Sequence, residues 1–200
     1  MKTFLALGDS YTIGEGVLLK DSFPYQTVQL LRLQNIEVAA PEIIAKTGWT
    51  TKNLIEGICS TKLLPKYDFV SLLIGVNNQY DGVSFEDFEK EFEVLIEKSI
   101  AFTNNNSNHV FVFSIPDWGA TPFAVDRDRV SITSEIKKYN NYCKLISEKY
   151  NCVFIEITES YILDAVKEEF LAADKLHPSG KEYGKWAEEL NKEIILLHFA

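Results

Sequence analysis

The sequence is poor in cysteine and in positive charge. Its 200 residues contain three cysteines, Cys59, Cys143 and Cys152, which cannot all pair and form no C-x-x-C motif. We therefore expect buried free thiols in a reducing compartment rather than a disulfide framework. Lys and Arg number 20 against 29 Asp and Glu, a net charge of −9. Because nucleic acids and anionic membranes require a basic face, this balance argues against both and favours a small or neutral partner.

Long hydrophobic runs are also absent. No stretch approaches the roughly 18 apolar residues that cross a membrane. The apolar segment at residues 4–7 is too short for the core of a secretion signal, and no A-x-A cleavage site follows it. We expect a cytoplasmic protein without an integral membrane segment, unless a leader was removed before Met1.

The composition that remains is typical of one globular domain, which we expect to span residues 1–200, with 46% hydrophobic and 24% charged residues. Five short apolar runs alternate with helical patterns, and the continuous ones are typical of strands covered on both faces. This alternation predicts an α/β fold, a five-stranded parallel sheet between two helical layers. The expected strands are residues 3–7, 36–40, 69–74, 110–115 and 152–157.

Helical periodicity marks the segments between these runs. Weaker patterns cover residues 23–33 and 51–59. Ser84 is an expected N-cap, and Ser179 with Glu182 forms an expected capping box. The stronger patterns repeat apolar residues every three or four positions: Phe85, Phe88, Phe92, Leu95 and Ile96, then Ile132, Ile136, Tyr139, Cys143, Ile146 and Tyr150, and finally Tyr183, Trp186, Leu190, Ile194 and Leu197.

A GDS tripeptide ending at Ser10 directly follows the first expected strand, at the sheet edge where ligands gather in such folds. Its glycines fit no phosphate-binding loop, because no G-K-[ST] follows and Gly8, Gly14 and Gly16 lack the G-x-G-x-x-G spacing. Thr12 also breaks the G-x-S-x-G nucleophile motif. Ser10 is therefore either a reactive serine or part of a structural turn, and its partners must decide.

A reactive serine needs a base, and three histidines are present. His109 begins an expected strand and His198 lies near the end of the sequence, so we expect both to be structural or solvated. His177 follows the fifth expected strand, with Asp174 three residues before it. That spacing on a turn lets the carboxylate orient one imidazole nitrogen and leaves the other free to take a serine proton.

Two further segments offer hydrogen-bond donors for an oxyanion, the charge that develops on the carbonyl oxygen during acyl transfer. Gly48 follows the second expected strand, and Asn77 follows the third with Gly75 before it. Ser10, Gly48, Asn77 and His177 all map to the same edge of one sheet, which favours a shared site over four independent loops.

The order of GDS, an isolated glycine, G-x-N and D-x-x-H resembles that of the SGNH hydrolases, or GDSL-type esterases and lipases, from Gly8 to His177. The resemblance implies a flavodoxin-like α/β/α sandwich. It also implies Ser10 as nucleophile, His177 as acid and base, Asp174 as its orienting group, and an oxyanion hole of the Ser10 and Gly48 amides with the Asn77 side chain.

The motifs depart from the family pattern at two positions. Tyr11 replaces the leucine of GDSL, and Asn78 replaces the aspartate of G-x-N-D. Both substitutions leave the proposed donor and nucleophile in place. Asp9, beside the nucleophile, is expected to brace the turn rather than act as a base.

These residues predict a serine esterase that acts on a small-molecule ester through an acyl-enzyme on Ser10, with no metal or organic cofactor. Small-acyl, carbohydrate-ester and lysophospholipid substrates remain open, as do an acyltransferase using the same triad and a non-catalytic module that binds a glycan or small ligand. The expected pocket residues are Trp49, Tyr80, Trp118 and Phe123.

Overall fold

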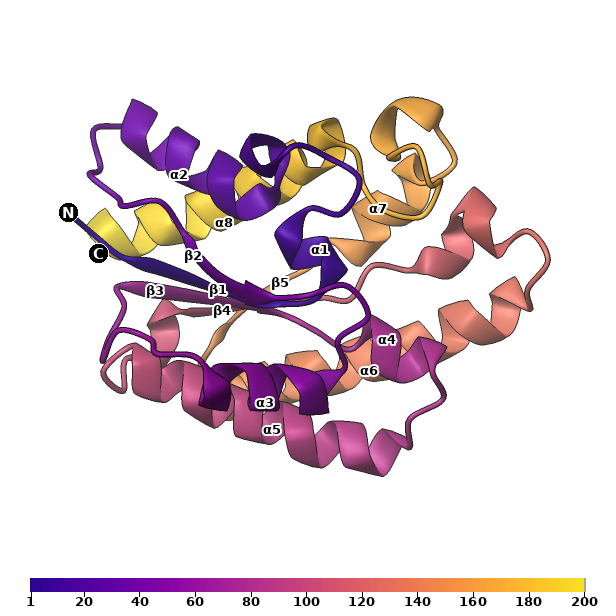
Figure 1. The fold of residues 1–200 in the computed structure, drawn as a ribbon, viewed down its shortest axis with the longest axis horizontal. Helices are drawn as coiled ribbons and strands as arrows, with labels where there is room; N and C mark the ends of the chain where they lie inside the picture. Colours follow the sequence, from indigo (N-terminus) through magenta and orange to yellow (C-terminus); the bar gives the residue numbers. More distant parts are fainter. Residues whose placement is uncertain (200) are drawn as a thin grey trace.

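In the computed structural model, which describes residues 1–199 and only the backbone of the last two of these, five strands form one parallel sheet of order β2-β1-β3-β4-β5. The strands are β1 (Phe4–Gly8), β2 (Glu42–Ala45), β3 (Phe69–Leu73), β4 (Val110–Phe113) and β5 (Val153–Ile155). Parallel neighbours need crossover connections, and helices on both faces provide them. Figure 1 shows the resulting three layers, so the expected flavodoxin-like sandwich is confirmed.

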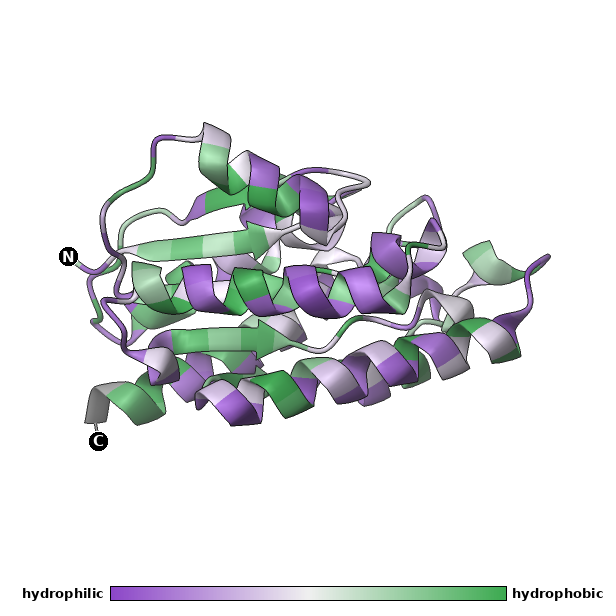
Figure 2. Ribbon diagram, turned by 90° about the horizontal axis from the view of Figure 1, so that it is seen from below, coloured by the Kyte–Doolittle hydropathy of each residue, from purple (hydrophilic) through white to green (hydrophobic). Residues whose placement is uncertain are grey.

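The two helical layers bury the apolar stripes expected from the sequence. Helices α2 (Phe23–Leu33) and α8 (Gly180–Phe199) pack together on one face, and α3 (Thr51–Ser60), α5 (Phe85–Phe102) and α6 (Arg129–Tyr150) cover the other. Figure 2 shows the second layer, whose helices mix hydrophilic and hydrophobic residues while the strands are mostly hydrophobic. Ser84 caps α5 as expected, because its hydroxyl accepts from the Asp87 amide at 3.1 Å.

Short elements follow the carboxyl ends of the strands and form the working edge of the sheet. Helix α1 (Ser10–Ile13) follows β1, α4 (Val76–Tyr80) follows β3, and α7 (Thr158–Asp164) follows β5. After β4 come two 3-10 turns, η3 (Trp118–Ala120) and η4 (Pro122–Ala124). Three further turns are η1 (Leu19–Asp21), η2 (Ser107–His109) and η5 (Glu168–Phe170).

The second strand lies later in the sequence than expected. Segment 36–40 contributes only an isolated bridge between Val38 and Lys2, and the ladder with β1 begins at Glu42. Pro41 separates the two parts, and its missing N–H interrupts the extended segment. The first strand is shifted by one residue to Phe4–Gly8, and the last three are one to three residues shorter than expected.

Two smaller expectations were wrong because tertiary contacts compete for the side chains. The Ser179 hydroxyl donates to the Glu169 carbonyl at 2.8 Å, and Glu182 accepts from the Trp186 indole at 3.0 Å, so these groups do not form the capping box. The three thiols are free, but only Cys143 is buried, and Cys59 is exposed.

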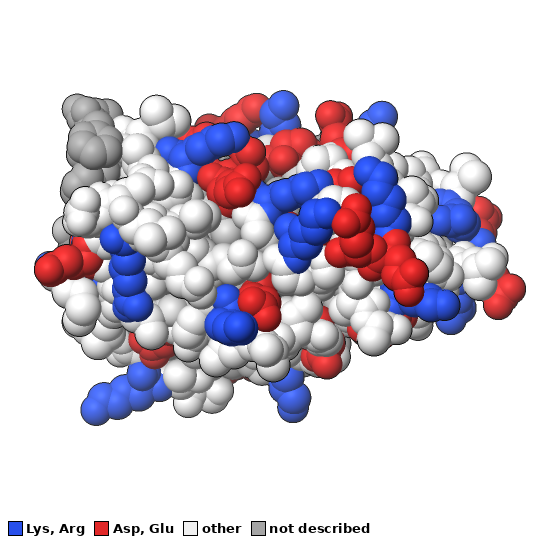
Figure 3. Space-filling view, turned by 90° about the horizontal axis from the view of Figure 1, so that it is seen from above, with Lys and Arg blue, Asp and Glu red and all other residues white. Residues whose placement is uncertain are grey.

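The surface over α2 and α8 carries charges of both signs. Figure 3 shows basic and acidic side chains interspersed there rather than gathered by sign. Among the described helices, none combines the length and the apolar character needed to cross a bilayer.

Candidate active site

Ser10 reaches the sheet edge through a tight exit from β1. A Cβ at Gly8 would lie 2.1 Å from the Thr12 hydroxyl and 2.3 Å from the Leu73 carbonyl oxygen, so only glycine fits there. The next residue, Asp9, caps α1, since its Oδ1 accepts from the Tyr11 amide at 3.0 Å. Ser10 is therefore the first residue of a short helix that closely follows β1 and is capped by Asp9.

A continuous chain of hydrogen bonds joins Ser10 to the far end of the sequence. His177 Nε2 lies 2.9 Å from Ser10 Oγ, and His177 Nδ1 lies 2.6 Å from Asp174 Oδ2. The Asp174–His177 pair expected from its spacing is in contact, and so is the Ser10–His177 pair expected from the shared sheet edge. This arrangement can move a proton from the hydroxyl to the imidazole while the carboxylate stabilises the resulting cation.

The surroundings of Asp174 stabilise its ionised form. Its other oxygen, Oδ1, accepts from the Leu176 and His177 amides, each at 2.9 Å. Partial burial acts to raise the pKa of Asp174, but the hydrogen bonds from the His177 ring and these amides outweigh it and lower the pKa.

The turn that carries both residues is fixed by contacts that the sequence did not reveal. The Ala172 amide donates to the His177 carbonyl at 2.8 Å, beside an antiparallel bridge between Leu171 and Pro178. The buried Tyr11 ring lies 4.9 Å from the imidazole, between ring centroids. Tyr11 thus supports the imidazole from the side of the nucleophile. In the sequence, the only sign of this contact is a large aromatic residue directly after Ser10.

Gly48 and Asn77 lie beside Ser10 at the same cavity, as the oxyanion-hole expectation requires. Gly48 has a φ of +80° and no neighbouring atom within 4 Å of the place a Cβ would occupy. Its backbone conformation is one that glycine adopts without strain. Asn77 Nδ2 donates to the Trp49 carbonyl at 2.9 Å. The same nitrogen donates its second hydrogen to Asp9 Oδ2 at the long distance of 3.5 Å, and an oxyanion in the cavity can take this hydrogen in place of that weak bond.

Asn78, where the family pattern has aspartate, is a buried structural residue. Its side chain accepts from the Thr51 amide at 3.0 Å and donates to the Thr51 hydroxyl at 2.7 Å. These bonds fix the start of α3 against α4, so the substitution keeps the loop that presents Asn77 in place.

Asp9 is a fully buried carboxyl beside the nucleophile. Burial raises its pKa to about 7, although the bond from the Tyr11 amide acts in the opposite direction. Its Oδ2 lies 3.5 Å from Asn77 Nδ2. The position agrees with a bracing role, because no contact joins Asp9 to the His177 imidazole among the hydrogen bonds of the described residues.

The cavity at the serine has a volume of about 220 Å³. Three of the four expected pocket residues line it: Tyr80, Trp118 and Phe123. Their rings contact in sequence, with centroid distances of 5.2 Å from Tyr80 to Trp118 and 6.2 Å from Trp118 to Phe123. Gln79, which the sequence did not single out, accepts from the Trp118 indole at 2.7 Å and orients that ring.

Trp49 corrects the fourth expectation. Its indole lies against α3, where a Cβ on Gly57 would come within 2.4 Å of the ring. The ring is not among the described groups that line the cavity. Gly57 leaves room on the helix for the indole, and Trp49 instead serves the site through its carbonyl, which holds Asn77.

The other histidines stand apart from this site. His109 Nδ1 contacts the Asp68 carbonyl oxygen at 2.8 Å, which agrees with a structural role. The side chain of His198 lies outside the described part of the chain.

The fold and the order of the motifs match a known family. The family model of the GDSL-like lipase/acylhydrolase family matches residues 6–184, and the chain belongs to this family. It is accordingly a serine ester hydrolase of the SGNH or GDSL type. No curated protein matches it in sequence.

Solved structures of two other esterases share the architecture. The lipase/acylhydrolase from Enterococcus faecalis has a TM-score of 0.75 at 22% identity, covering 97% of this chain and 95% of its own. The acetylxylan esterase from Geobacillus stearothermophilus has a TM-score of 0.74 at 19% identity, covering 96% of this chain and 94% of its own.

Proposed function

We propose that this protein hydrolyses short-chain carboxylic esters through an acyl-enzyme on Ser10. The observation that carries the proposal is the hydrogen-bond chain from Ser10 Oγ through His177 to Asp174, with distances of 2.9 and 2.6 Å. A hydroxyl, an imidazole and a carboxylate connected in this order form the unit that activates a serine for attack on a carbonyl.

In the first half of the reaction, Ser10 Oγ attacks the ester carbonyl while His177 Nε2 takes the serine proton. The oxyanion receives hydrogen bonds from the Ser10 and Gly48 amides and from the Asn77 side-chain amide, whose long bond to Asp9 it replaces. Asp174 stabilises the imidazolium. The C–O bond to the alcohol then breaks, and His177 donates its proton to the leaving oxygen.

In the second half, water attacks the acyl-enzyme. His177 Nε2 takes a proton from that water, the same donors hold the second oxyanion, and collapse returns the proton to Ser10 as the acid leaves. Two protons thus pass in turn through His177 Nε2: the first moves from Ser10 to the alcohol, and the second moves from water to Ser10.

The size of the cavity supports a short acyl group. Its volume of about 220 Å³ lies below the roughly 300–1,000 Å³ typical of sites for drug-sized ligands. Tyr80 and Phe123 are 46% and 42% exposed, so the aromatic side of the cavity is open to solvent rather than closed around a long chain. A short acyl group, such as the acetyl group in the name of the acetylxylan esterase of the structural comparison, fits within this volume.

Labelling with a fluorophosphonate tests the nucleophile directly. We expect covalent mass on Ser10 in the wild type and none in Ser10→Ala. Ser60→Ala is the matched control, because Ser60 is an exposed serine at the end of α3. Absence of labelling in the folded wild type would contradict the proposal and favour the non-catalytic ligand-binding alternative.

A series of p-nitrophenyl esters from acetate to laurate tests the acyl preference. We expect kcat/KM to be highest for the shortest chains and to fall as the chain outgrows the cavity. A maximum at the long chains would contradict the short-acyl assignment while leaving the nucleophile in place.

A further inference from the structure

A second and larger cavity, of about 370 Å³, lies beside the catalytic one. The turn that carries the base contributes Ala173 and Lys175 to it, and the facing segments contribute Pro122, Val166 and Glu168. None of the steps described above uses this cavity.

A backbone hydrogen bond joins a residue that lines one cavity to a residue that lines the other. Pro122 and Lys175 line the larger one, whereas the next residues along the chain, Phe123 and Leu176, line the catalytic one. Across the boundary, the Phe123 amide donates to the Lys175 carbonyl at 3.3 Å. The larger cavity therefore begins where the catalytic cavity ends.

The chemistry of the reaction tells which part of an ester faces this boundary. The oxyanion points toward Gly48 and Asn77, on the α3 and α4 side of Ser10. The leaving oxygen must lie at His177 Nε2 to receive its proton. The alcohol portion consequently extends toward the turn that carries His177, and the larger cavity is built on that turn.

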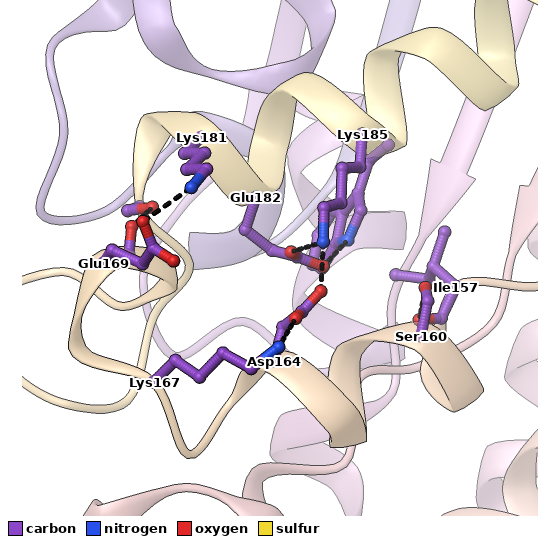
Figure 4. Close-up of polar contacts among 10 residues, drawn as sticks. Ile157, Ser160, Asp164, Lys167, Glu169, Lys181, Glu182 and Lys185 are labelled. Atoms are coloured by element: carbon purple, nitrogen blue, oxygen red, sulfur yellow. Dashed lines mark hydrogen bonds and ion pairs between the residues drawn. The ribbon is translucent and has the colours of Figure 1, made fainter.

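The outer wall of the cavity is tied to α8 by a cluster of charges. Asp164 pairs with Lys167 at 2.8 Å and also contacts Lys185, while Glu169 pairs with Lys181 at 2.6 Å (Figure 4). These bonds hold the segment between Asp164 and Glu169, which contains Val166 and Glu168. A wall fixed in this way is suited to a binding subsite, since supporting contacts position its side chains before a ligand arrives.

The ammonium groups of this cluster also cover the ring of Phe170, which directly precedes the lining residue Leu171. Lys181 Nζ and Lys185 Nζ lie 4.4 and 4.0 Å from the centroid of the Phe170 ring. Such cation–π contacts add to the ion pairs that fix the segment.

We propose that this cavity binds the alcohol portion of the ester, and that this alcohol is an uncharged polyhydroxy group the size of one sugar ring. The assignment deepens the proposed esterase function and rests on it. At about 30 Å³ for each water-sized group, a volume of 370 Å³ holds on the order of a dozen such groups.

The lining chemistry fits such a group. Pro122, Val166 and Leu171 offer apolar surface for the C–H face of a ring. Glu168 and Lys175 offer an acceptor and a donor whose charges cancel. Hydroxyl groups use both, whereas a phosphodiester has no hydrogen to donate to the Glu168 carboxylate and can use Lys175 alone.

Two esters that share one acyl group test the subsite. Methyl acetate and a mono-O-acetylated methyl pyranoside form the same acetyl-enzyme, so their kcat/KM values differ only through the alcohol. Val166→Trp fills the cavity from an exposed position of the wall, and Leu145→Trp, at an exposed position of α6, is the matched control.

We expect Val166→Trp to lower the ratio of kcat/KM for the sugar ester over methyl acetate by about tenfold or more. Leu145→Trp keeps the wild-type ratio. Glu168→Gln, which removes a charged acceptor but keeps its shape, lowers the ratio by about threefold. An equal fall for both esters in Val166→Trp would indicate general damage to the site and overturn the assignment.

The outcomes separate this inference from the proposed function. If Ser10 is labelled and methyl acetate is hydrolysed but Val166→Trp leaves the ratio unchanged, the alcohol subsite is wrong and the esterase assignment stands. If the wild type is neither labelled nor active, the esterase assignment itself fails. Faster turnover of a lysophosphatidylcholine than of the sugar ester would overturn the polyhydroxy assignment.

Discussion

The two ends of the sheet hold the same residue types in different connections. At the carboxyl ends of the strands, Asp174 contacts the His177 ring, which contacts the Ser10 hydroxyl. A hydroxyl, a carboxylate and a histidine also lie close together at the amino ends. They belong to Thr3, Asp68 and His109, each of which directly precedes a strand.

At the amino ends these groups are not connected as a relay. Asp68 Oδ2 accepts from the Thr3 amide at 2.8 Å and from the Thr3 hydroxyl at 3.0 Å. His109 contacts the Asp68 backbone carbonyl, and among the described residues no hydrogen bond joins its ring to a carboxylate or a hydroxyl. A hydroxyl, a carboxylate and a histidine near one another therefore do not suffice for a reactive site, because the imidazole must lie between the hydroxyl and the carboxylate.

Replacing each histidine in turn should give the largest difference in kcat between the two ends of the sheet. We expect His177→Ala to lower kcat on the order of 10⁶-fold, because serine loses its base. His109→Ala should keep kcat within about twofold and lower only stability, through the lost carbonyl contact. Steady-state hydrolysis of p-nitrophenyl acetate measures both, and similar losses in the two variants would contradict the assignment of His177.

The two aspartates give the next effect. Asp174→Asn should lower kcat on the order of 10⁴-fold, since a neutral amide no longer stabilises the imidazolium or selects its tautomer. Asp68→Asn should keep kcat, because Asp68 contacts backbone and surface groups rather than the imidazole. Circular dichroism establishes that both variants are folded. An equal kcat in Asp174→Asn and the wild type would remove Asp174 from the relay.

The sequence predicts the residues at the site better than it predicts the position of one strand. The edge residues Ser10, Gly48, Asn77 and His177 were predictable because short polar motifs directly follow apolar runs, and parallel strands share one edge. The position of β2 was not predictable, because pairing with β1 selects between two extended segments flanking Pro41.

Side-chain directions were also beyond the sequence. Trp49 neighbours Gly48, yet its indole occupies space that Gly57 leaves on α3. That contact joins residues of different elements, and no local pattern encodes it. The same reason applies to Glu182, whose carboxylate faces Trp186 instead of the helix N-terminus.

The pH dependence of the free energy of unfolding should differ in sign between Asp9, at the carboxyl ends of the strands, and Asp68, at their amino ends. The pKa of Asp9 is raised to about 7 by burial, so the folded state binds its proton more tightly than the unfolded state. This contribution to stability is complete below the unfolded pKa near 4 and is lost as pH rises toward 7, at most about 4 kcal/mol. The pKa of Asp68 is lowered, since bonds from Thr3 and Lys2 outweigh partial burial. Its contribution is lost as pH falls.

Urea unfolding at pH 3, pH 5 and pH 8 measures these two contributions. Asp9→Asn should reduce the loss of stability between pH 5 and pH 8, and Asp68→Asn should cost more stability at pH 5 than at pH 3, because the Asp68 contribution is lost only below the unfolded pKa near 4. Asp9→Asn keeps a side-chain carbonyl for the Tyr11 amide, so the cap survives. An unchanged pH dependence in both variants would contradict the opposite signs.

The smallest expected effect separates two neighbours at the same end. Asn77→Ala should lower kcat by about 10²–10³ with little change in KM, because one oxyanion donor is lost. Asn78→Ala should keep kcat and lower the free energy of unfolding by about 1–3 kcal/mol, since it leaves the buried Thr51 amide unpaired. Equal kcat values in Asn77→Ala and Asn78→Ala would contradict the oxyanion assignment.

The contact between Ser10 and His177 joins residues 167 positions apart in the chain. During synthesis, the nucleophile leaves the ribosome 167 residues before its base. A nascent chain that has not yet released His177 therefore carries an inert serine. Hydrolytic competence appears only when both segments have been made and brought together, and it can report that this part of the chain has folded.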